Sequence, residues 1–318
     1  MFSTDFFSSE INKWLSEIEY PAKPQGLYEP IAYMLSGGGK RLRPTLMCAV
    51  CESLGLSFDY IRSQAIGIEM FHNFTLLHDD VMDNADIRHG KPTVHRKWNI
   101  PTAILSGDTM LTLASEYMSD CSSEISKDIM DLFNKTAIEI YEGQQYDMNF
   151  ESRQVVVTDE YLDMIRLKTA VLLGCACKIG AIAAKASPMV QNQFYQYGVK
   201  LGMAFQLRDD YLDSFGDPAV FGKQIGGDIL NDKKTYLSIL AWENAKNEML
   251  KATSITTASE KIENVKELYT ALGVDAKCLE LISSYTDEAI NLLKGIGLSA
   301  DDMEFFENLA LTAVKRNS

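Results

Sequence analysis

Proline is scarce in this sequence, and its eight copies are unevenly placed. None falls between residues 102 and 187, and none follows residue 218. Because proline breaks the interior of a helix, these two tracts permit long helices. Runs of β-branched residues are nearly absent as well, Val155–Val157 being the exception. The two shortages together favour helices and argue against a fold built from sheets.

Long hydrophobic runs are also missing. No apolar stretch approaches the roughly 20 residues that a membrane-spanning helix needs. The first residues, MFSTDFFSSEINKW, lack the basic region and the apolar stretch of a signal peptide. Hydrophobic residues make up 46% and charged residues 23% of the 318 positions, which is typical of soluble globular proteins. We therefore expect a cytoplasmic protein with no stable membrane span.

Positive charge is in short supply. The chain has 30 lysines and arginines against 44 aspartates and glutamates, which gives a net charge of -14. This balance argues against nucleic acid or an anionic membrane as a general partner. Any local cluster of basic residues in so acidic a chain is therefore informative.

Six cysteines in a chain of this length, without an export signal, indicate reduced thiols. Cys48 and Cys51 form a CxxC, and Cys175 and Cys177 form a CxC, so a structural zinc site is an alternative. Both pairs lie in apolar, helix-like sequence without a glycine knuckle. Buried thiols are therefore the favoured interpretation.

Apolar residues recur at helical spacing in four long segments, 61–83, 158–186, 189–213 and 276–295. In the first segment, one stripe is formed by Ile66, Met70, Asn73, Leu77 and Val81. No linker, charge block or short-period repeat divides the chain. We expect one all-α domain over residues 1–318, with roughly ten to thirteen helices and short loops near 21–26, 36–40, 84–92 and 214–228.

Two clusters of aspartate stand out: Asp79, Asp80 and Asp83 in LLHDDVMD, and Asp209, Asp210 and Asp213 in FQLRDDYLD. Residues four apart share a helix face, so each cluster presents paired carboxylates near the C-terminal end of a helix. Anions are disfavoured at that end of the helix dipole, and bound cations would remove the penalty. Oxygen ligands with room left for phosphate suit Mg²⁺ best. A solvated acidic helix end is the alternative.

Basic residues gather beside glycines and beside these clusters. In GGGKRLRP, the basic residues Lys40, Arg41 and Arg43 lie between a glycine run and a helix opened by Pro44. A loop of this kind presents backbone N–H groups and positive charges that can bind an anion. The other candidates are Arg88 after the first cluster, Lys168 with Thr169 in MIRLKTAVLLG, and Lys223 and Lys233 after the second cluster. Together they predict carboxylates for metal and cations for two diphosphates.

All four histidines, at positions 72, 78, 89 and 95, fall around the first cluster. A His–Asp metal site of the phosphohydrolase type is therefore another alternative. It would leave the second cluster and the lysines without a role, so the diphosphate interpretation is preferred.

In these motifs the sequence resembles the trans-isoprenyl diphosphate synthases, the family of farnesyl and geranylgeranyl diphosphate synthases. The motifs that match in order and spacing, over roughly residues 26–316, are GGGKRLRP, HDDVMDNADIRHG, the KT of LKTA, FQLRDDYLD and GKQIGGDILNDKKT. The resemblance implies a single large helical bundle around a deep central cavity, usually a homodimer, with about three Mg²⁺ ions. It implies a short-chain prenyltransferase that condenses an allylic diphosphate with isopentenyl diphosphate.

The resemblance also implies roles for single residues. Metal ligands would be Asp79, Asp83 and Asp209, with Asp213 as a further candidate and with Asp80 and Asp210 in support. The allylic diphosphate would be contacted by Arg88, Lys168, Lys223 and Lys233. Isopentenyl diphosphate would be contacted by Lys40, Arg43 and His72. The reacting carbons would be lined by Thr169 and Gln206, where a hydroxyl or carbonyl dipole stabilises positive charge.

One position departs from the family pattern. The family usually has two consecutive arginines after the first cluster, and here they are Arg88 and His89. The second arginine normally helps to hold isopentenyl diphosphate. We therefore expect His89 to weaken that contact or to make it dependent on pH.

The length of the product is expected to be set along the helix that carries the first cluster. Phe74 and Thr75 lie one turn before Asp79, and Phe71 lies one turn deeper. One turn rises about 5.4 Å, close to one isoprene unit. By resemblance, short-chain synthases often carry bulky aromatics at both near positions and long-chain ones carry small residues. This chain has one bulky residue, Phe74, and one small residue, Thr75, which predicts geranylgeranyl diphosphate as the product, with farnesyl diphosphate as the alternative. The other interpretation is that Phe74 only packs the core.

Two further functions stay open. A class I terpene cyclase ionises the same kind of substrate but folds one chain on itself, and a non-catalytic subunit modulates another synthase. Cyclases usually lack the second aspartate motif and the GGGKRLRP loop, and such subunits commonly lose aspartates from one cluster. This chain has all of these features, which favours the prenyltransferase.

Overall fold

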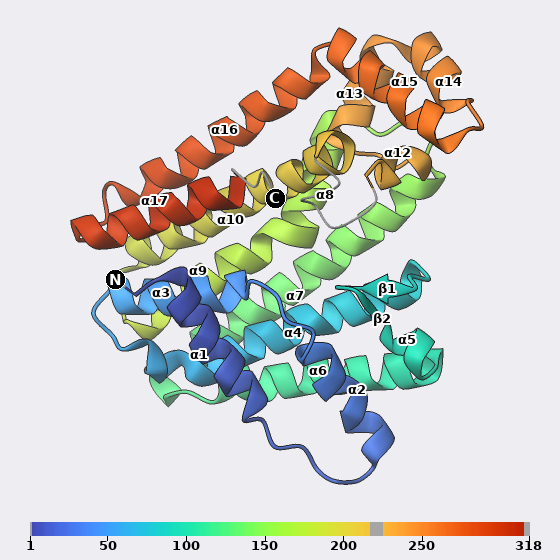
Figure 1. Ribbon diagram of the computed structural model, residues 1–318. Coiled ribbons are helices and arrows are strands. Elements are labelled where there is room, and N and C mark those ends of the chain that lie inside the picture. The colour runs from blue at the N-terminus through green and yellow to red at the C-terminus, as the bar shows by residue number, and fades with distance from the viewer. Residues whose placement is uncertain (1, 217–224, 315–318) are drawn as a thin grey trace. The chain divides into compact units, whose positions relative to one another are not determined.

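Helices form nearly all of the regular structure in residues 2–216 and 225–314, the part of the chain that the computed structural model describes (Figure 1). The chain forms two compact units. The first contains Met1–Asn134 and Ala176–Asn192, and the second contains Lys135–Cys175 and Gln193–Ser318. The all-α class predicted from the sequence is confirmed. The single domain over residues 1–318 stays a prediction.

The first unit carries the first aspartate cluster. Its elements, in chain order, are α1 (Thr4–Ser16), α2 (Gln25–Leu35), α3 (Leu42–Ser53), the 3-10 helix η1 (Phe58–Ile61), α4 (Arg62–Met82), β1 (Ile87–Arg88), β2 (Lys91–Pro92), α5 (Val94–Lys97), α6 (Ile100–Ser119), the start of α7 (Ser123–Ser152), the later part of α9 (Val171–Ala183) and the start of α10 (Pro188–Phe215).

The second unit carries the second aspartate cluster. Its elements, after the remainder of α7, are α8 (Thr158–Ile165), the π-helix η2 (Arg166–Ala170), the start of α9 (Val171–Ala183), most of α10 (Pro188–Phe215), α12 (Gly227–Leu230), α13 (Tyr236–Asn244), α14 (Lys246–Thr253), α15 (Ala258–Ala271), α16 (Val274–Leu293) and α17 (Ala300–Val314).

Helix α4 is formed by the apolar stripe that the sequence predicts. Ile66, Met70 and Leu77 are each no more than 4% exposed. The helix lies along α6 and also contacts α3 (Figure 1). At Gly67 a Cβ atom would stand 3.1 Å from the carbonyl oxygen of Ala114, so the glycine permits this close approach of α4 and α6. The packed stripe fixes α4 and therefore the aspartates at its end.

A short hairpin occupies most of the loop expected near residues 84–92. β1 pairs antiparallel with β2, with Arg88 opposite Lys91. His89 and Gly90 form the turn with left-handed φ values of 50° and 74°, the backbone that a two-residue hairpin turn prefers. Strands of two residues are too short to show alternation in the sequence, which is why only a loop was expected.

Two of the other three predicted helical segments are continuous helices in the structure, and the third is interrupted. Segments 189–213 and 276–295 correspond to α10 and α16, while 158–186 is interrupted by the π-helix η2. The described ranges contain sixteen α-helical segments, more than the ten to thirteen expected. The difference arises because the break and the four-residue helices, such as α5 and α12, leave no periodic signal.

The paired cysteines are buried in helices, as predicted. Cys48 and Cys51 in α3, and Cys175 and Cys177 in α9, are 0% exposed. Within residues 2–216 and 225–314, no three histidine, cysteine, aspartate or glutamate side chains form a group that could hold a metal ion, so the zinc alternative gains no support. In the same ranges, no helix has both the length and the apolar character to cross a membrane.

Candidate active site

The first aspartate site consists of Asp79, Asp80, Asp83 and Arg88. Asp79 and Asp80 lie in the last turn of α4, and Asp83 is its C-cap, with its backbone N–H donating to the carbonyl oxygen of Asp79 at 2.8 Å. Asp79 and Asp83 are therefore one helical turn apart, as predicted from their spacing. The aspartates also lie at the negative end of the helix dipole, which makes a cation favourable there.

Asp80 is the buried member of this cluster, with 1% of its surface exposed. The Nε atom of Arg88, on β1, donates to its Oδ1 at 2.7 Å. Its Oδ2 is buried and has no hydrogen-bond partner. Burial raises the pKa of the Asp80 carboxyl even though Arg88 opposes the shift. The charge of this carboxylate is thus only partly compensated by the protein.

Arg88 and His89 share a shallow pocket with Asp80 and with Gly37 of the glycine run. The pocket is completed by Tyr33, Met34, Lys91, Pro92, Thr93 and Val94. The hairpin and the start of the glycine-rich loop therefore meet beside the first aspartate site, and the hairpin brings the basic side chains Arg88, His89 and Lys91 to it.

Arg43 and His72, predicted to contact the same substrate, lie side by side. A terminal guanidinium nitrogen of Arg43 is 3.0 Å from Nε2 of His72. Desolvation, followed by the charge of Arg43, lowers the pKa of His72 well below its ordinary value. The neutral ring can accept a hydrogen bond from Arg43 and so orient the guanidinium. Lys40 lies exposed in the loop before α3.

Arg41, the middle cation of GGGKRLRP, is a structural anchor. Its backbone is left-handed, with φ 47°, and its side chain is buried. The guanidinium donates to Glu69 Oε1 at 2.7 Å, to the carbonyl oxygen of Leu35 at 2.7 Å and to Asn12 Oδ1 at 3.0 Å. A buried ion pair is costly unless it is hydrogen-bonded in this way. Arg41 thus fastens the loop to α1, α2 and α4.

The residues predicted to set product length belong to an aromatic cluster in the first unit. The ring of Phe71 is 5.1 Å from that of Phe133 and 5.6 Å from that of Phe74. Phe74 is 5% exposed, and its ring is also 4.8 Å from the ring of His78. The half-buried Thr75 donates its hydroxyl to the carbonyl oxygen of His72 at 2.8 Å. Phe74 therefore has a packing role, whatever else it does.

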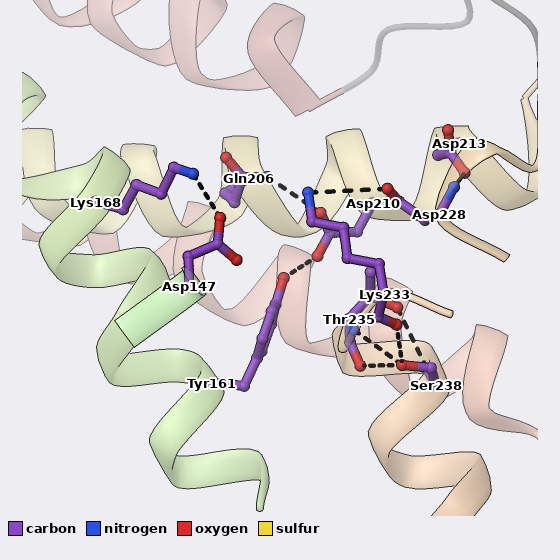
Figure 2. Close-up of polar contacts among 10 residues, drawn as sticks. All are labelled: Asp147, Tyr161, Lys168, Gln206, Asp210, Asp213, Asp228, Lys233, Thr235 and Ser238. Atoms are coloured by element: carbon purple, nitrogen blue, oxygen red, sulfur yellow. Dashed lines mark hydrogen bonds and ion pairs between the residues drawn. The ribbon is translucent and has the colours of Figure 1, made fainter. Parts of the chain in front are cut away.

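The second aspartate site consists of Asp209, Asp210, Asp213 and Gln206 in the last turns of α10. Asp210 is 5% exposed and accepts two hydrogen bonds (Figure 2). Tyr161 of α8 donates its hydroxyl to Oδ2, and Gln206 donates Nε2 to Oδ1 at 3.1 Å. Burial, with Asp228 as the next cause, raises the pKa of Asp210 well above its ordinary value. Thr169 donates to Oε1 of Gln206 at 3.0 Å, so these two predicted residues do meet.

Asp213 holds the segment that follows α10. Its Oδ2 accepts the backbone N–H of Asp228 at 2.9 Å, and its carbonyl oxygen accepts the N–H of Gly226 at 2.6 Å. Nζ of Lys233 lies 3.8 Å from Oδ1 of Asp228 (Figure 2). Asp213 thus connects the second cluster to Lys233. Lys223 lies outside the described residues.

Lys168 lies in the π-helix η2, where it pairs with Asp147 of α7 at 2.5 Å. Short π-helices occur often at functional sites because they shift side chains out of helical register. A Cβ atom at Gly143, one turn before Asp147, would stand 2.3 Å from the backbone nitrogen of Lys168. The glycine lets α7 contact the π-helix, and the contact places Asp147 against Lys168.

Three residues near these sites were missed by sequence reasoning: Asp147, Tyr161 and Asp228. The only sequence signal for Asp147 is that it lies four residues after Gly143 in a proline-free tract. Asp228 follows a glycine pair between the second cluster and Lys233. Tyr161 is one tyrosine of 14 and carries no signal that distinguishes it from a core residue.

The chain is also similar to known proteins. Residues 24–272 match the polyprenyl synthetase family. A geranylgeranyl diphosphate synthase from Methanosarcina mazei is 41% identical over 238 residues, which cover 74% of each chain. A geranylfarnesyl diphosphate synthase from Natronomonas pharaonis is 41% identical over 249 residues, which cover 73% of each chain.

A solved structure shows the same fold. A crystal structure of a geranylgeranyl pyrophosphate synthase is 40% identical, covers 100% of both chains and superposes with a TM-score of 0.96. The fold and the two aspartate clusters thus define an all-α isoprenoid synthase. The chain belongs to the polyprenyl synthetase family.

The contact at Gly143 gives the first testable prediction. Replacing Gly143 by Ala should push α7 away from the π-helix, because the new Cβ would meet backbone atoms that cannot rotate aside. We expect a loss of about 1–3 kcal/mol in the free energy of unfolding. Displacement of Lys168 should also lower turnover by roughly tenfold or more. Denaturant unfolding and steady-state kinetics measure the two effects.

Gly26→Ala is the matched control, because a Cβ at this helical glycine would meet nothing within 4 Å. The control should keep its activity and its stability. Parental stability and turnover in Gly143→Ala would show that the close contact is unimportant.

Proposed function

We propose that this chain is a Mg²⁺-dependent trans-prenyltransferase that condenses an allylic diphosphate with isopentenyl diphosphate and releases diphosphate. The observation that carries the proposal is that each unit holds an aspartate cluster near a helix end with a paired basic residue nearby. The family and the named synthases among its relatives support the same reaction. The proposed product is geranylgeranyl diphosphate, with farnesyl diphosphate as the alternative.

The residues present fit Mg²⁺. Oδ2 of Asp80 is a buried oxygen without a hydrogen-bond partner, and a nearby divalent cation would compensate its charge. We propose Asp79, Asp83 and Asp209 as ligands for about three ions. Asp213 is a weaker candidate, since its Oδ2 is already hydrogen-bonded to Asp228. Because the described residues form no complete protein ligand set, substrate phosphate oxygens would complete the coordination.

The reaction is proposed to begin with ionisation of the allylic C–O bond. Asp79, Asp83 and Asp209 would hold the Mg²⁺ ions, which would supply positive charge to neutralise the leaving diphosphate. Arg88, Lys168 and Lys233 bind that diphosphate, and Lys223 joins them. Lys168 can do so while it is paired with Asp147, because its ammonium group has three donors.

The carbon–carbon bond forms in the second step. Lys40, Arg43 and His72 hold isopentenyl diphosphate, whose double bond attacks the allylic cation at about 3–3.5 Å. Oxygen atoms of Thr169 and Gln206 stabilise the cation before the attack. The cationic adduct then loses a proton to the released diphosphate and becomes the product, so charge and atoms balance without a dedicated side-chain base.

We also propose a cytoplasmic homodimer. The six free cysteines suit a reducing compartment. Helix α6 exposes the apolar residues Ile100, Ile104 and Leu105, which are 49%, 44% and 59% exposed. Apolar side chains exposed along one helix are a candidate dimer surface.

Removal of either aspartate site should abolish catalysis without unfolding the protein. We expect Asp79→Ala and Asp209→Ala to lower turnover by about 10²–10³, because each loses charge stabilisation of the transition state. Excess chelator should have the same effect on the parent. Asp131→Ala, which removes an exposed carboxylate that pairs with Lys127, is the control and should stay active.

The same assay separates the alternative functions. Product should form only when isopentenyl diphosphate is supplied, whereas a terpene cyclase would convert the allylic substrate alone. A non-catalytic subunit would make no product under either condition. Full turnover in chelator, or in either aspartate variant, would count decisively against the metal site.

The product-length proposal predicts opposite shifts at neighbouring residues. Phe74→Ala should lengthen the product by at least one isoprene unit of about 5 Å. Thr75→Phe should shorten it. Mass spectrometry of the products measures both, and Phe74→Tyr, which retains the ring, is the control. If Phe74→Ala is folded and active but makes the parental product, Phe74 only packs the aromatic cluster.

His89 should give isopentenyl diphosphate binding a pH dependence. If the imidazolium contacts the diphosphate, affinity is greatest while the ring is protonated and falls as pH rises through the range in which histidine loses its proton. His72 should not contribute, because its lowered pKa keeps it neutral over this range. His89→Arg should remove the dependence of KM on pH. Matching pH profiles of parent and variant would mean that His89 points elsewhere.

A further inference from the structure

Tyr161 is a tyrosine where a phenylalanine would fill the same space. It is 2% exposed and lies in the apolar core of the second unit, among Met164, Ile165 and other buried side chains. A buried hydroxyl is costly unless it is hydrogen-bonded, and this one donates to Oδ2 of Asp210 (Figure 2). The contact joins α8 to the second aspartate site.

Asp210 in turn determines which way the amide of Gln206 points. The side-chain NH₂ group of Gln206 is the part that faces Oδ1 of Asp210, to which it donates at 3.1 Å. The carbonyl oxygen of Gln206 is then directed to Thr169, whose hydroxyl must donate to it. The oxygen atoms of both Gln206 and Thr169 are thereby left as the negative ends of their dipoles.

We propose that Tyr161 is a positioning residue that acts through Asp210 on Gln206 and Thr169. Its hydroxyl holds the Asp210 carboxylate in the rotamer that locks the Gln206 amide. The locked amide keeps oxygen atoms, not N–H groups, available to the allylic cation. This inference rests on the proposed function, because an oxygen dipole matters only where positive charge develops.

Tyr161→Phe tests the proposal, since it removes the hydroxyl and preserves the ring. We expect kcat to fall about tenfold, which corresponds to the free energy of one hydrogen bond. KM for both substrates should stay within about twofold of the parental values. Selective ¹⁵N-glutamine labelling gives a readout that does not depend on activity. The Gln206 side-chain amide, assigned by its absence in Gln206→Met, should exchange its protons faster in Tyr161→Phe than in the parent.

Tyr197→Phe is the matched control. Tyr197 is 0% exposed, and its hydroxyl donates to the carbonyl oxygen of Phe306 at 2.9 Å. The control therefore loses an equally buried hydrogen bond in the same unit, and it should lose stability while keeping kcat and the Gln206 exchange rate. A merely structural Tyr161 would behave as Tyr197 does.

A second variant covers the case in which Tyr161→Phe does not fold. Asp210→Asn keeps the shape of the side chain but lets an NH₂ group face Gln206, which should reverse the Gln206 amide and lower kcat. Parental kcat in either variant overturns the proposal. Parental Gln206 exchange in Tyr161→Phe also overturns it, even if the chain proves to catalyse no prenyl transfer. A parent that is inactive with isopentenyl diphosphate would refute the proposed function separately.

Discussion

A buried carboxylate at the second position of each aspartate cluster is the constraint on which both sites depend. Asp80 and Asp210 are 1% and 5% exposed, so water compensates little of their charge and neighbouring groups must do so. Asp80 receives a cation, Arg88, and this draws the hairpin to the end of α4. Asp210 receives neutral donors, among them Tyr161, and this ties α8 to α10. The more exposed aspartates of each cluster are held in place by these buried neighbours.

The basic residues of the GGGKRLRP motif also differ in whether they compensate a buried carboxylate. Arg41 donates hydrogen bonds to three acceptors inside the first unit, and its charge stabilises the fold by pairing with a buried carboxylate. Arg43, two residues later, is paired with the ring of His72, which carries no opposing charge. The neutral ring of His72 neither neutralises nor repels the guanidinium charge of Arg43. Two arginines of one motif thus have different surroundings: Arg41 is paired with the buried carboxylate of Glu69, and Arg43 lies beside the neutral ring of His72.

The sequence was sufficient for features that repeat or that use rare combinations of charge. The stripes of α4, α10 and α16 follow from apolar periodicity, and the aspartate clusters follow from their spacing. The hairpin, the π-helix and Tyr161 could not be predicted in this way. Two-residue strands have no period, a π-helix differs from an α-helix by one residue, and the role of Tyr161 depends on Asp210, 49 residues away in the chain. Contacts over such separations depend on packing that local patterns do not encode.

The position of Lys168 is set by backbone contacts before any side chain is considered. Gly143 lets α7 approach one part of the π-helix, and at Gly202 of α10 a Cβ atom would stand 2.5 Å from Cα of Ala170, two residues after Lys168. Rigid helices thus contact the π-helix at two points, and a backbone held in this way moves less than a flexible side chain. Because Asp147 lies one turn from Gly143, the Lys168–Asp147 ion pair is a consequence of helix spacing. The position of Lys168 at the second site therefore depends on Gly143 and Gly202, because alanine at either position would force the helices apart.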